Sequence, residues 1–447
     1  MQRLLALPLV LFLICAPAVR GQSVEVKDFV LKNGLKVLMV ENHTVPSVCF
    51  AIGFHVGSRN ERPGITGLAH MFEHMMFNGS KKYRPTEFDQ IVEAGGGYSN
   101  AYTAHDITFY FEEFNPDLLD KVLDMEVDRM RALKLDSENL EQERGIVKEE
   151  RRVSTDNDLR GKMFEDLYAT AFTVHPYRNP IGGWMEDLSA ITLQDAKEFF
   201  RTYYAPNNAT VIIVGAFDAK TLRPKMEKMF GTLPRGPALP RVPGVEPQQL
   251  GERRANLHRI AELPAVAVAY KGAAVSSIDF SALDLLTTIL TQGQSSRMYR
   301  RLVHELEIAT EIGGGIEECV DPGLVTFFVQ TQPGKTVEDA EKELYAIISD
   351  IAENGVREEE LQKAKNISQM SYAGEFKTNV GIALRLGRFE GIYGGYRKAF
   401  EAPERYAKIS VEDIKRVAQT YLSERLRSVV VLIPEKPETK SADPSGQ

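Results

Sequence analysis

Residues 68 to 79 read LAHMFEHMMFNG, and their apolar positions follow a helical repeat. Leucine, methionine and phenylalanine recur at intervals of three and four, which places them on one face of a helix. The members of this apolar stripe are Leu68, Met71, Phe72, Met75 and Met76. Asn78-Gly79 then predicts the end of the helix, because both residues are common just past a helical C-terminus. The stretch therefore predicts a short helix with one buried face.

Two histidines on this helix carry the first chemical prediction. His70 and His74 are four residues apart, so their rings project from the same face, beside the apolar stripe. Two imidazoles at this spacing suit a divalent zinc ion. Glu73 lies next to them, where its carboxylate can take a proton from water on the metal without binding the metal itself. A surface helix with ordinary histidines is the plain alternative.

A catalytic zinc needs a third protein ligand and one open position. The acidic stretch NLEQERGIVKEE, residues 139–150, contains the candidates. Helical spacing places Glu143 and Glu150 on one face, and we expect Ile146 and Val147 to make that face the buried one. One of these two glutamates is expected to bind the metal and the other to orient a ligand, and the spacing leaves the order open. A solvated charge run is the alternative.

These residues together resemble the pitrilysin family of zinc peptidases, whose metal motif is the inverted HxxEH pattern. The smaller members, similar to the subunits of the mitochondrial processing peptidase, are closest in length. Between His74 and Glu150 lie 75 residues, which matches the family's spacing for the third ligand. The resemblance therefore implies one zinc per chain, bound by His70, His74 and Glu150. It makes Glu73 the general base and places Glu143 behind a ligand.

The resemblance extends over nearly all of the chain beyond its N-terminal leader. It implies an α+β fold of two homologous domains, each a mostly antiparallel sheet packed with helices. It also implies that two subunits pair around an enclosed chamber. Asn100-Ala101 resemble the start of an edge strand that binds an extended peptide substrate through backbone hydrogen bonds. Such pairing accepts any sequence, so the substrate's own sequence stays open.

One part of the family pattern is missing from this chain. Complete members carry an arginine and a tyrosine, seven residues apart in the last domain, that stabilise the tetrahedral intermediate. The matching positions here are Val303 and Thr310, and neither is a cation or a phenolic donor. We therefore predict that a second family subunit supplies the pair in a hetero-oligomer. A homodimer is the alternative.

Proline-rich sequence divides the chain into two halves. Residues 233–255 contain five prolines and predict a linker, since this density interrupts helices and central strands. It separates a zinc-binding domain, residues 24–232, from a peptidase-like domain, residues 256–434. The stretches 195–214 and 413–432 share a helix-then-strand pattern at an offset of 218 residues, which indicates a duplicated domain. Strands and helices do not alternate regularly, which favours α+β over a doubly wound sheet.

The two ends of the chain carry their own patterns. Arg3 precedes an apolar run that ends in small residues, which predicts a signal peptide of residues 1–21. Cleavage after Ala18 is the alternative. We expect an exported protein, periplasmic or extracellular. An uncleaved anchor is a further alternative, although the apolar run is shorter than the roughly 20 residues of a spanning helix. No long stretch after the N-terminus lacks charge, so no stable membrane span is expected after cleavage. Residues 435–447 are polar and proline-containing, and are predicted to be disordered.

Charge and cysteine content exclude some partners. The chain of 447 residues has a net charge of -8, and loss of the two arginines in the leader makes it -10. An acidic protein is poorly suited to bind nucleic acid. Cys49 and Cys319 lie among apolar residues in different halves, so we expect buried free thiols and no disulfide.

The sequence thus predicts a zinc-dependent endopeptidase for peptides or unfolded protein segments, as the catalytic subunit of a two-subunit enzyme. A non-catalytic peptide-binding or assembly subunit on the same fold is the alternative. Such relatives generally lose the metal residues that this chain retains. A serine hydrolase lacks support, because the sequence has no Gly-x-Ser-x-Gly motif.

Overall fold

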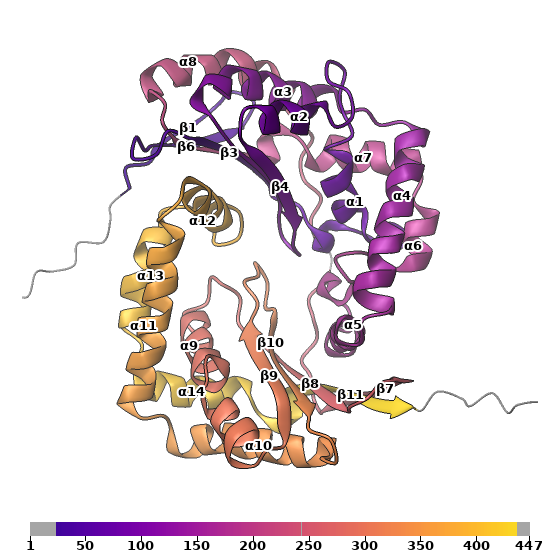
Figure 1. Cartoon of the computed structure of the whole chain (residues 1–447), viewed down its shortest axis with the longest axis vertical. Helices are drawn as coiled ribbons and strands as arrows, with labels where there is room; N and C mark the ends of the chain where they lie inside the picture. The colour runs from indigo at the N-terminus through magenta and orange to yellow at the C-terminus, as the bar shows by residue number, and fades with distance from the viewer. Residues whose placement is uncertain (1–23, 243, 436–447) are drawn as a thin grey trace, which may run out of the picture.

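The computed structural model describes residues 24–242 and 244–435. The predicted signal peptide and residues 436–447 of the predicted disordered tail lie outside the described residues. The chain forms two halves, each a mostly antiparallel sheet packed with helices (Figure 1). The predicted α+β class with two similar domains is therefore confirmed. Within the described ranges, no helix is both long and apolar enough to cross a membrane.

The first half contains six strands and most of the shorter helices. Its strands are β1 Lys27–Val30, β2 Lys36–Glu41, β3 Val48–Phe54, β4 Tyr98–Thr103, β5 Thr108–Phe114 and β6 Ala209–Gly215. Its α-helices are α1 Leu68–Met75, α2 Glu87–Ala94, α3 Leu119–Ala132, α4 Ser137–Arg151, α5 Leu159–Ala171, α6 Met185–Ala190, α7 Leu193–Tyr203 and α8 Ala219–Met229. Short 3-10 turns are η1 Ser58–Asn60, η2 Pro116–Leu118, η4 Pro176–Arg178, η5 Pro206–Asn208 and η6 Phe230–Thr232, and η3 Arg152–Asp156 is a π-helical turn.

The second half follows the same plan. Its strands are β7 Arg253–Ile260, β8 Ala265–Lys271, β9 Ala309–Ile316, β10 Leu324–Thr331 and β11 Arg427–Glu435. Its α-helices are α9 Phe280–Thr291, α10 Val337–Asn354, α11 Glu358–Glu375, α12 Asn379–Gly391, α13 Lys398–Ala407 and α14 Val411–Tyr421. A π-helical turn, η7 Tyr299–Glu305, and a 3-10 turn, η8 Glu424–Leu426, complete it.

The two sheets share one strand order. In the first sheet it is β1-β2-β6-β3-β5-β4, and in the second it is β7-β11-β8-β10-β9. β6 pairs parallel to β2 and antiparallel to β3, as β11 pairs parallel to β7 and antiparallel to β8. The second sheet thus repeats the first without a counterpart of β1.

The predicted repeat also holds in local detail. Helices α7 and α14 start 218 residues apart, and both have 11 residues. Each begins with a capping box, formed by Thr192 with Asp195 and by Ser410 with Asp413. A reciprocal pair of this kind satisfies two backbone donors in the first helical turn. The same sequence device therefore fixes the start of the same helix in both halves.

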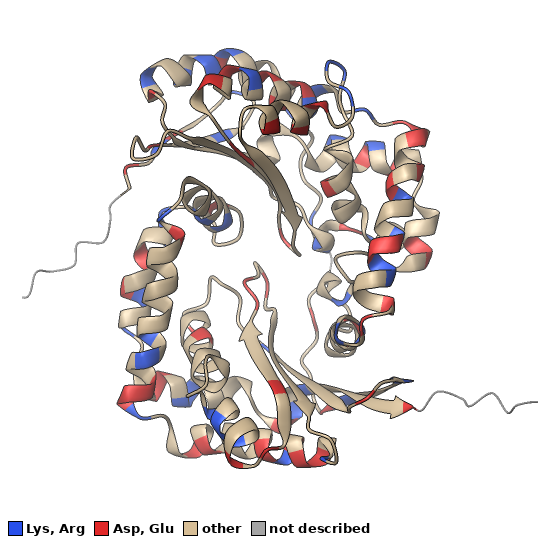
Figure 2. Ribbon diagram, in the orientation of Figure 1, with Lys and Arg blue, Asp and Glu red and all other residues tan. Residues whose placement is uncertain are grey.

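Both faces of the first sheet are buried. On β3, Phe50 and Ile52 join the core formed with the helices of the first half. Cys49 and Ala51, which alternate with them, join a core that includes Leu386 of α12. Cys49 and Cys319 are both buried and unpaired, as predicted. Figure 2 shows the strands mostly uncharged, while basic and acidic residues intermix along the peripheral helices.

The helices that cover these second faces are exchanged between the halves. α12 lies against β3 and β6 of the first sheet, and α5 lies against β7, β8 and β11 of the second (Figure 1). In α5, Met163 and Leu167 pack on Ala267 and Val430. α5 and α12 are separated by close to the offset of the repeat, so two equivalent helices have changed sheets. Neither half covers its own sheet completely.

The segment between the halves is anchored to the first half. Among its described residues, positions 233–252 form no helix or strand. The carboxylate of Glu246 accepts hydrogen bonds of 2.8–3.0 Å from the backbone N–H groups of residues 173–175. Burial by itself would raise the pKa of Glu246, but these three N–H groups and the nearby Lys271 lower it to about 2. The ionised carboxylate of Glu246 therefore stabilises the folded state.

Gly387 marks a close approach of α12 to the first sheet. A Cβ at this position would lie 2.1 Å from Cζ of Phe109, a buried ring that stacks on Tyr102. We predict that Gly387→Ala lowers the free energy of unfolding by about 1–3 kcal/mol, because the packed ring has no room to move. Denaturant titration measures the change.

Gly145→Ala is the matched control. Gly145 is an exposed residue within α4, and a Cβ there meets nothing within 4 Å. The same substitution should therefore raise the free energy of unfolding by about 0.5–1 kcal/mol, through helix propensity. Equal effects at the two positions would contradict the close approach.

Glu246 makes the stability depend on pH. Because its folded-state pKa lies below the ordinary value of 4.5, its contribution is complete above pH 4.5 and is lost as the pH falls towards 2. We predict that Glu246→Gln lowers the free energy of unfolding by about 2–3 kcal/mol at neutral pH. The difference from the parent protein should narrow in titrations below pH 4.5. A constant difference at acid pH would contradict this assignment.

Candidate metal centre

The helix α1 is fixed along its length and at its start. All five residues of its apolar stripe are buried, as predicted. The Tyr110 hydroxyl donates a 2.9 Å hydrogen bond to the carbonyl oxygen of Phe72. At the N-terminus, the Glu61 carboxylate accepts hydrogen bonds of 2.8 and 2.7 Å from the backbone N–H groups of Gly67 and Ala69. These bonds satisfy donors that the first turn leaves free. The polar face of α1 is thereby held in one orientation.

The helix α4 supplies the acidic side of the site. Glu143 and Val147 are buried on the face towards α1, as predicted. Ile146 was predicted to share this face, but it is 44% exposed. The prediction was wrong because the contact with α1 is narrow. A residue three positions after Glu143 is rotated about 60° away from it, which already directs the side chain to solvent.

The three predicted ligands converge. Nε2 of His70 lies 3.7 Å, and Nε2 of His74 3.3 Å, from Oε2 of Glu150. The ligand atoms of the three residues all lie within 4.8 Å of one another. Atoms about 2.0–2.2 Å from a tetrahedral zinc ion would be about 3.4 Å apart. Two imidazole nitrogens and one carboxylate oxygen at these separations fit zinc, and they leave one position open.

Glu143 lies behind His74. Its Oε2 is 3.5 Å from Nδ1 of His74, and Asn78 donates a 2.6 Å hydrogen bond to its Oε1. Burial would raise the pKa of Glu143, but the hydrogen bonds from His74 and Asn78 outweigh it and lower that pKa. The same contact with Glu143 raises the pKa of His74, whereas burial lowers that of His70. With Nδ1 engaged, the His74 ring presents Nε2 to Glu150.

A cavity of about 300 Å³ opens beside these residues. Glu73 lines it together with His70 and Glu150, so the proposed base faces the same space as the ligands. Ser154 and Thr155 of the π-helical turn η3 also line it. A π-helical turn at the end of α4 redirects the chain around the cavity, a frequent arrangement at functional sites.

The strand β4 runs along the same cavity. Tyr102 and Thr103 line it, and β4 is an edge strand of the first sheet. Asn100 and Ala101 lie on this strand, which begins at Tyr98, two residues before the predicted start. Oδ1 of Asn100 accepts a 2.8 Å hydrogen bond from the backbone N–H of Ala101. A peptide that paired with this N–H would have to displace the Asn100 side chain.

Arg151 is a residue of the site that the sequence prediction missed. It lines the cavity, pairs with Glu165 at 2.6 Å and donates a 2.8 Å hydrogen bond to the carbonyl oxygen of Gly183. Gly183 has φ +77°, and a Cβ there would lie 2.3 Å from the carbonyl oxygen of Thr66. Arg151 thus holds the loop that closes the cavity against the start of α1. No local pattern distinguishes it from the other charged residues around it.

The two positions predicted from the sequence to match the family's arginine and tyrosine lie in the second half. Val303 belongs to the turn η7 and packs against the core. Thr310 belongs to β9, where its hydroxyl donates a 3.4 Å hydrogen bond to the carbonyl oxygen of Gln330. Neither side chain can stabilise an oxyanion as an arginine or a tyrosine would.

Known proteins are similar to this chain in sequence and in fold. Residues 36–183 match the family model described as Insulinase (Peptidase family M16), and residues 190–368 match the Peptidase M16 inactive domain. The zinc protease PqqE of Helicobacter pylori is 32% identical, over 97% of this chain and 99% of its own length. The crystal structure of a protease from Helicobacter pylori has a TM-score of 0.88 at 31% identity, covering 93% of this chain and 100% of that chain.

A two-sheet α+β fold with an HxxEH helix beside an acidic helix defines an inverted-motif metallopeptidase scaffold. The chain belongs to peptidase family M16, the pitrilysin-like family. The periplasmic protease PqqL from Escherichia coli shares the fold, with a TM-score of 0.73 at 20% identity. The similarity covers 92% of this chain and 48% of PqqL, so this chain corresponds to about half of that protein.

Substitutions of three glutamates of α4 should lower the zinc affinity to different extents. Glu150→Gln removes the proposed ligand, so we predict the largest loss of zinc affinity for this variant. Glu143→Gln weakens the support of His74 and should lower the affinity by about 10–100-fold. Glu149→Gln is the control, because it makes the same charge change at a side chain that is 65% exposed. Competition with a chromogenic chelator measures all three. An equal loss for Glu149→Gln would indicate a general charge effect.

Proposed function

We propose that this chain is a zinc-dependent endopeptidase that hydrolyses peptides or unfolded protein segments. The observation that carries the proposal is the convergence of His70, His74 and Glu150, with Glu73 lining the same cavity. Three protein ligands with one open position are typical of catalytic zinc, whereas structural sites are closed by four. Membership of family M16 and the similarity to a zinc protease support the same conclusion.

The residues of the site divide the chemistry between them. Bound zinc would supply a Lewis acid that polarises the scissile carbonyl and lowers the pKa of water. Glu73 takes a proton from the attacking water and delivers it to the leaving amine. Because Glu73 lies on α1 between the two histidines, one helix positions the base and two of the ligands. We assign the backbone of Asn100 and Ala101, on the edge strand β4, to holding the peptide in an extended form.

A second subunit belongs to this proposal. Val303 and Thr310 stand where complete family members place an arginine and a tyrosine, so the chain needs another source of oxyanion stabilisation. We assign that role to a second family subunit in a hetero-oligomer, with a homodimer as the alternative. The predicted signal peptide makes export, to the periplasm or outside the cell, part of the same proposal. A fold shared with a periplasmic protease supports it.

The peptidase test compares the zinc-loaded chain with its Glu73→Gln variant on a quenched fluorescent peptide. We predict that the variant retains its zinc and loses about 10²–10⁴-fold in cleavage rate, because only the proton transfer is removed. The chain alone should cleave weakly, and addition of the partner subunit should raise the rate.

Two outcomes would change the proposal. Full activity of the isolated chain would contradict the need for a second subunit. Zinc binding without cleavage, even with the partner present, would favour the non-catalytic peptide-binding alternative.

A further inference from the structure

The second half contains a cavity of about 770 Å³ among α9, α11, α12 and α13. Its place in the fold matches that of the metal site, because α9 and α11 are the counterparts of α1 and α4 in the repeat. The residues 218 positions after the three proposed zinc ligands all line this cavity. They are Thr288, Gln292 and Ser368. The two halves therefore have a cavity at equivalent places, but the second cavity has no histidine or carboxylate at the positions of the proposed ligands.

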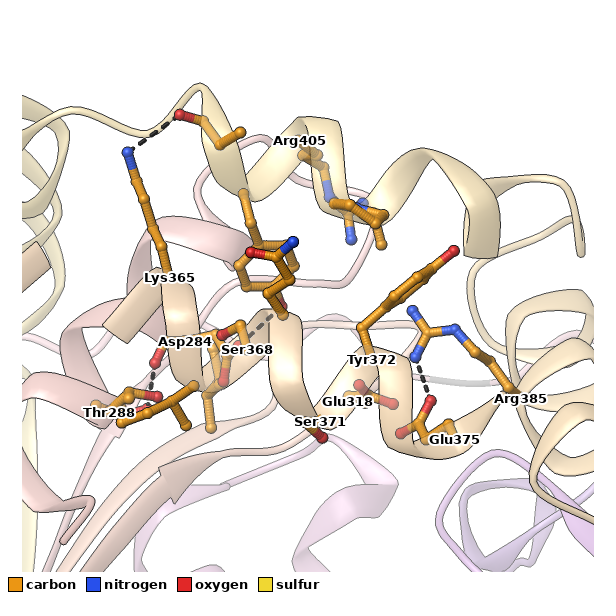
Figure 3. Close-up of a pocket in the computed structure, with 18 of the residues that line it drawn as sticks. Asp284, Thr288, Glu318, Lys365, Ser368, Ser371, Tyr372, Glu375, Arg385 and Arg405 are labelled. Carbon is orange, nitrogen blue, oxygen red and sulfur yellow. Dashed lines mark hydrogen bonds and ion pairs between the residues drawn. The ribbon is translucent and has the colours of Figure 1, made fainter. Parts of the chain in front are cut away.

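The cavity is lined by charged and aromatic side chains (Figure 3). Two of its arginines are neutralised by carboxylates within the cavity itself. Arg385 pairs with Glu375, and Nε of Arg388 lies 3.1 Å from Glu318. The carboxylate of Asp284 accepts a 2.8 Å hydrogen bond from the Tyr406 hydroxyl. The two ion pairs and this hydrogen bond fix the walls of the cavity, and they leave Arg385 and Arg388 already paired.

Among the described residues, two cations of the cavity, Lys365 and Arg405, form no ion pair with a carboxylate. Lys365 donates a 3.0 Å hydrogen bond to the carbonyl oxygen of Ala407, which leaves Arg405. It points from α13 into the cavity (Figure 3) and forms no ion pair with a carboxylate of the described chain. Its Nε and Nη2 are buried, and neither has a hydrogen-bond partner among the described residues. The guanidinium lies over the rings of Tyr393 and Tyr406, at 5.6 and 6.0 Å from their centroids. The side chain as a whole is half-buried, but two buried donors without an acceptor are unfavourable, so this arrangement suits a ligand that brings acceptor oxygens and a negative charge.

The surroundings of the cavity favour a peptide as that ligand. Gly315 and Ile316 of β9 line it, and β9 is an edge strand of the second sheet, as β4 is of the first. An edge strand offers backbone groups to an extended chain. The helix α12 also adjoins residues of both cavities. Arg388 follows Gly387, whose backbone meets the Phe109 ring, and Phe109 stacks on Tyr102 of the metal site.

We propose that this cavity binds a carboxylate group of a peptide, with Arg405 as the anion-binding residue. The peptide part of this inference rests on the proposed function. The carboxylate is either the C-terminal group of the peptide or an aspartate or glutamate side chain, because a guanidinium binds both in the same bidentate manner. One end of a peptide would then be held in the second half while another segment reaches the metal site.

The experiment measures binding without turnover. The zinc-loaded Glu73→Gln chain is titrated with three fluorescent peptides, and anisotropy reports their affinity. The first peptide has a free C-terminus and no acidic residue, the second is its C-terminal amide, and the third is that amide with one internal glutamate. The peptide or peptides that carry the recognised carboxylate should bind at least about tenfold more tightly than the neutral amide. Arg405→Gln should remove this difference.

Arg397→Gln is the matched control for the Arg405 variant. Arg397 is the N-cap of the same helix, α13, and its side chain is 70% exposed. The Arg397→Gln substitution should leave the preference for carboxylate-bearing peptides unchanged. Because Arg405 has no anionic partner to lose, and only the two ring contacts with Tyr393 and Tyr406, Arg405→Gln should also leave the thermal midpoint of the free protein nearly unchanged or raise it. A structural role for Arg405 would lower it.

A second variant keeps the proposal testable if Arg405→Gln folds poorly. Ser368→Glu places a carboxylate in the cavity at a partly exposed position. This carboxylate should pair with Arg405 and lower the affinity for the peptides that carry the recognised carboxylate. Equal affinity for all three peptides in the parent chain would overturn the proposal. The proposal would also be overturned if inorganic phosphate displaced all three peptides while the chain bound the three with equal affinity. Cleavage assays report the proposed function separately, because binding at this cavity needs no turnover.

Discussion

The fold depends on the burial of two sheets that are apolar on both faces. A sheet of this kind is stable only when helices or loops cover both sides. The outer face of the first sheet is covered by helices of its own half, but the inner face is covered by α12 from the second half. α5 does the same for the second sheet. The boundary between the halves is therefore part of the hydrophobic core, and the halves cannot separate without exposing it.

Buried polar contacts reinforce the same boundary. In the first half, Nε of Arg59 lies 2.9 Å from Oδ1 of Asp106. Nη1 of Arg59 lies 3.0 Å from Oδ2 of Asp321, which belongs to the second half. The Tyr177 hydroxyl donates to Asp106 and accepts a 3.1 Å hydrogen bond from the backbone N–H of Asp321. A displacement of one half would break the contacts of Arg59 and Tyr177 with Asp321, while their contacts with Asp106 lie within the first half. The contacts with Asp321 add directionality to the apolar packing.

The metal centre inherits its geometry from this packing. His70 and His74 share one helix, so their spacing is local, but Glu150 comes from another helix whose distance from α1 is set by buried side chains. Val147 of α4 packs into the same core as the apolar stripe of α1. A ligand set divided between two helices therefore needs the core to be formed before the metal can be bound in a tetrahedral arrangement.

Local spacing explains what the sequence could predict. The stripe of α1, the paired histidines and the inward face of Glu143 all follow from helical periodicity, and the duplication follows from a constant offset. Ile146 escaped prediction because its exposure depends on how narrowly α4 contacts α1. The roles of Arg151 and Glu61 were not predicted, because each side chain forms hydrogen bonds with backbone groups outside its own helix or turn. The exchange of α5 and α12 concerns which sheet a helix covers, and no periodicity within one helix carries that information.

The exchange of α5 and α12 between the sheets also determines when each half can complete its packing during synthesis. A chain made from its N-terminus completes all six strands of the first sheet long before α12 exists. Until Gly391 has been made, Cys49, Ala51 and Phe109 have no cover on the inner face. Contacts of such large sequence separation form late and slowly. The half of the molecule that holds every proposed zinc ligand thus reaches its final packing only after most of the other half is present.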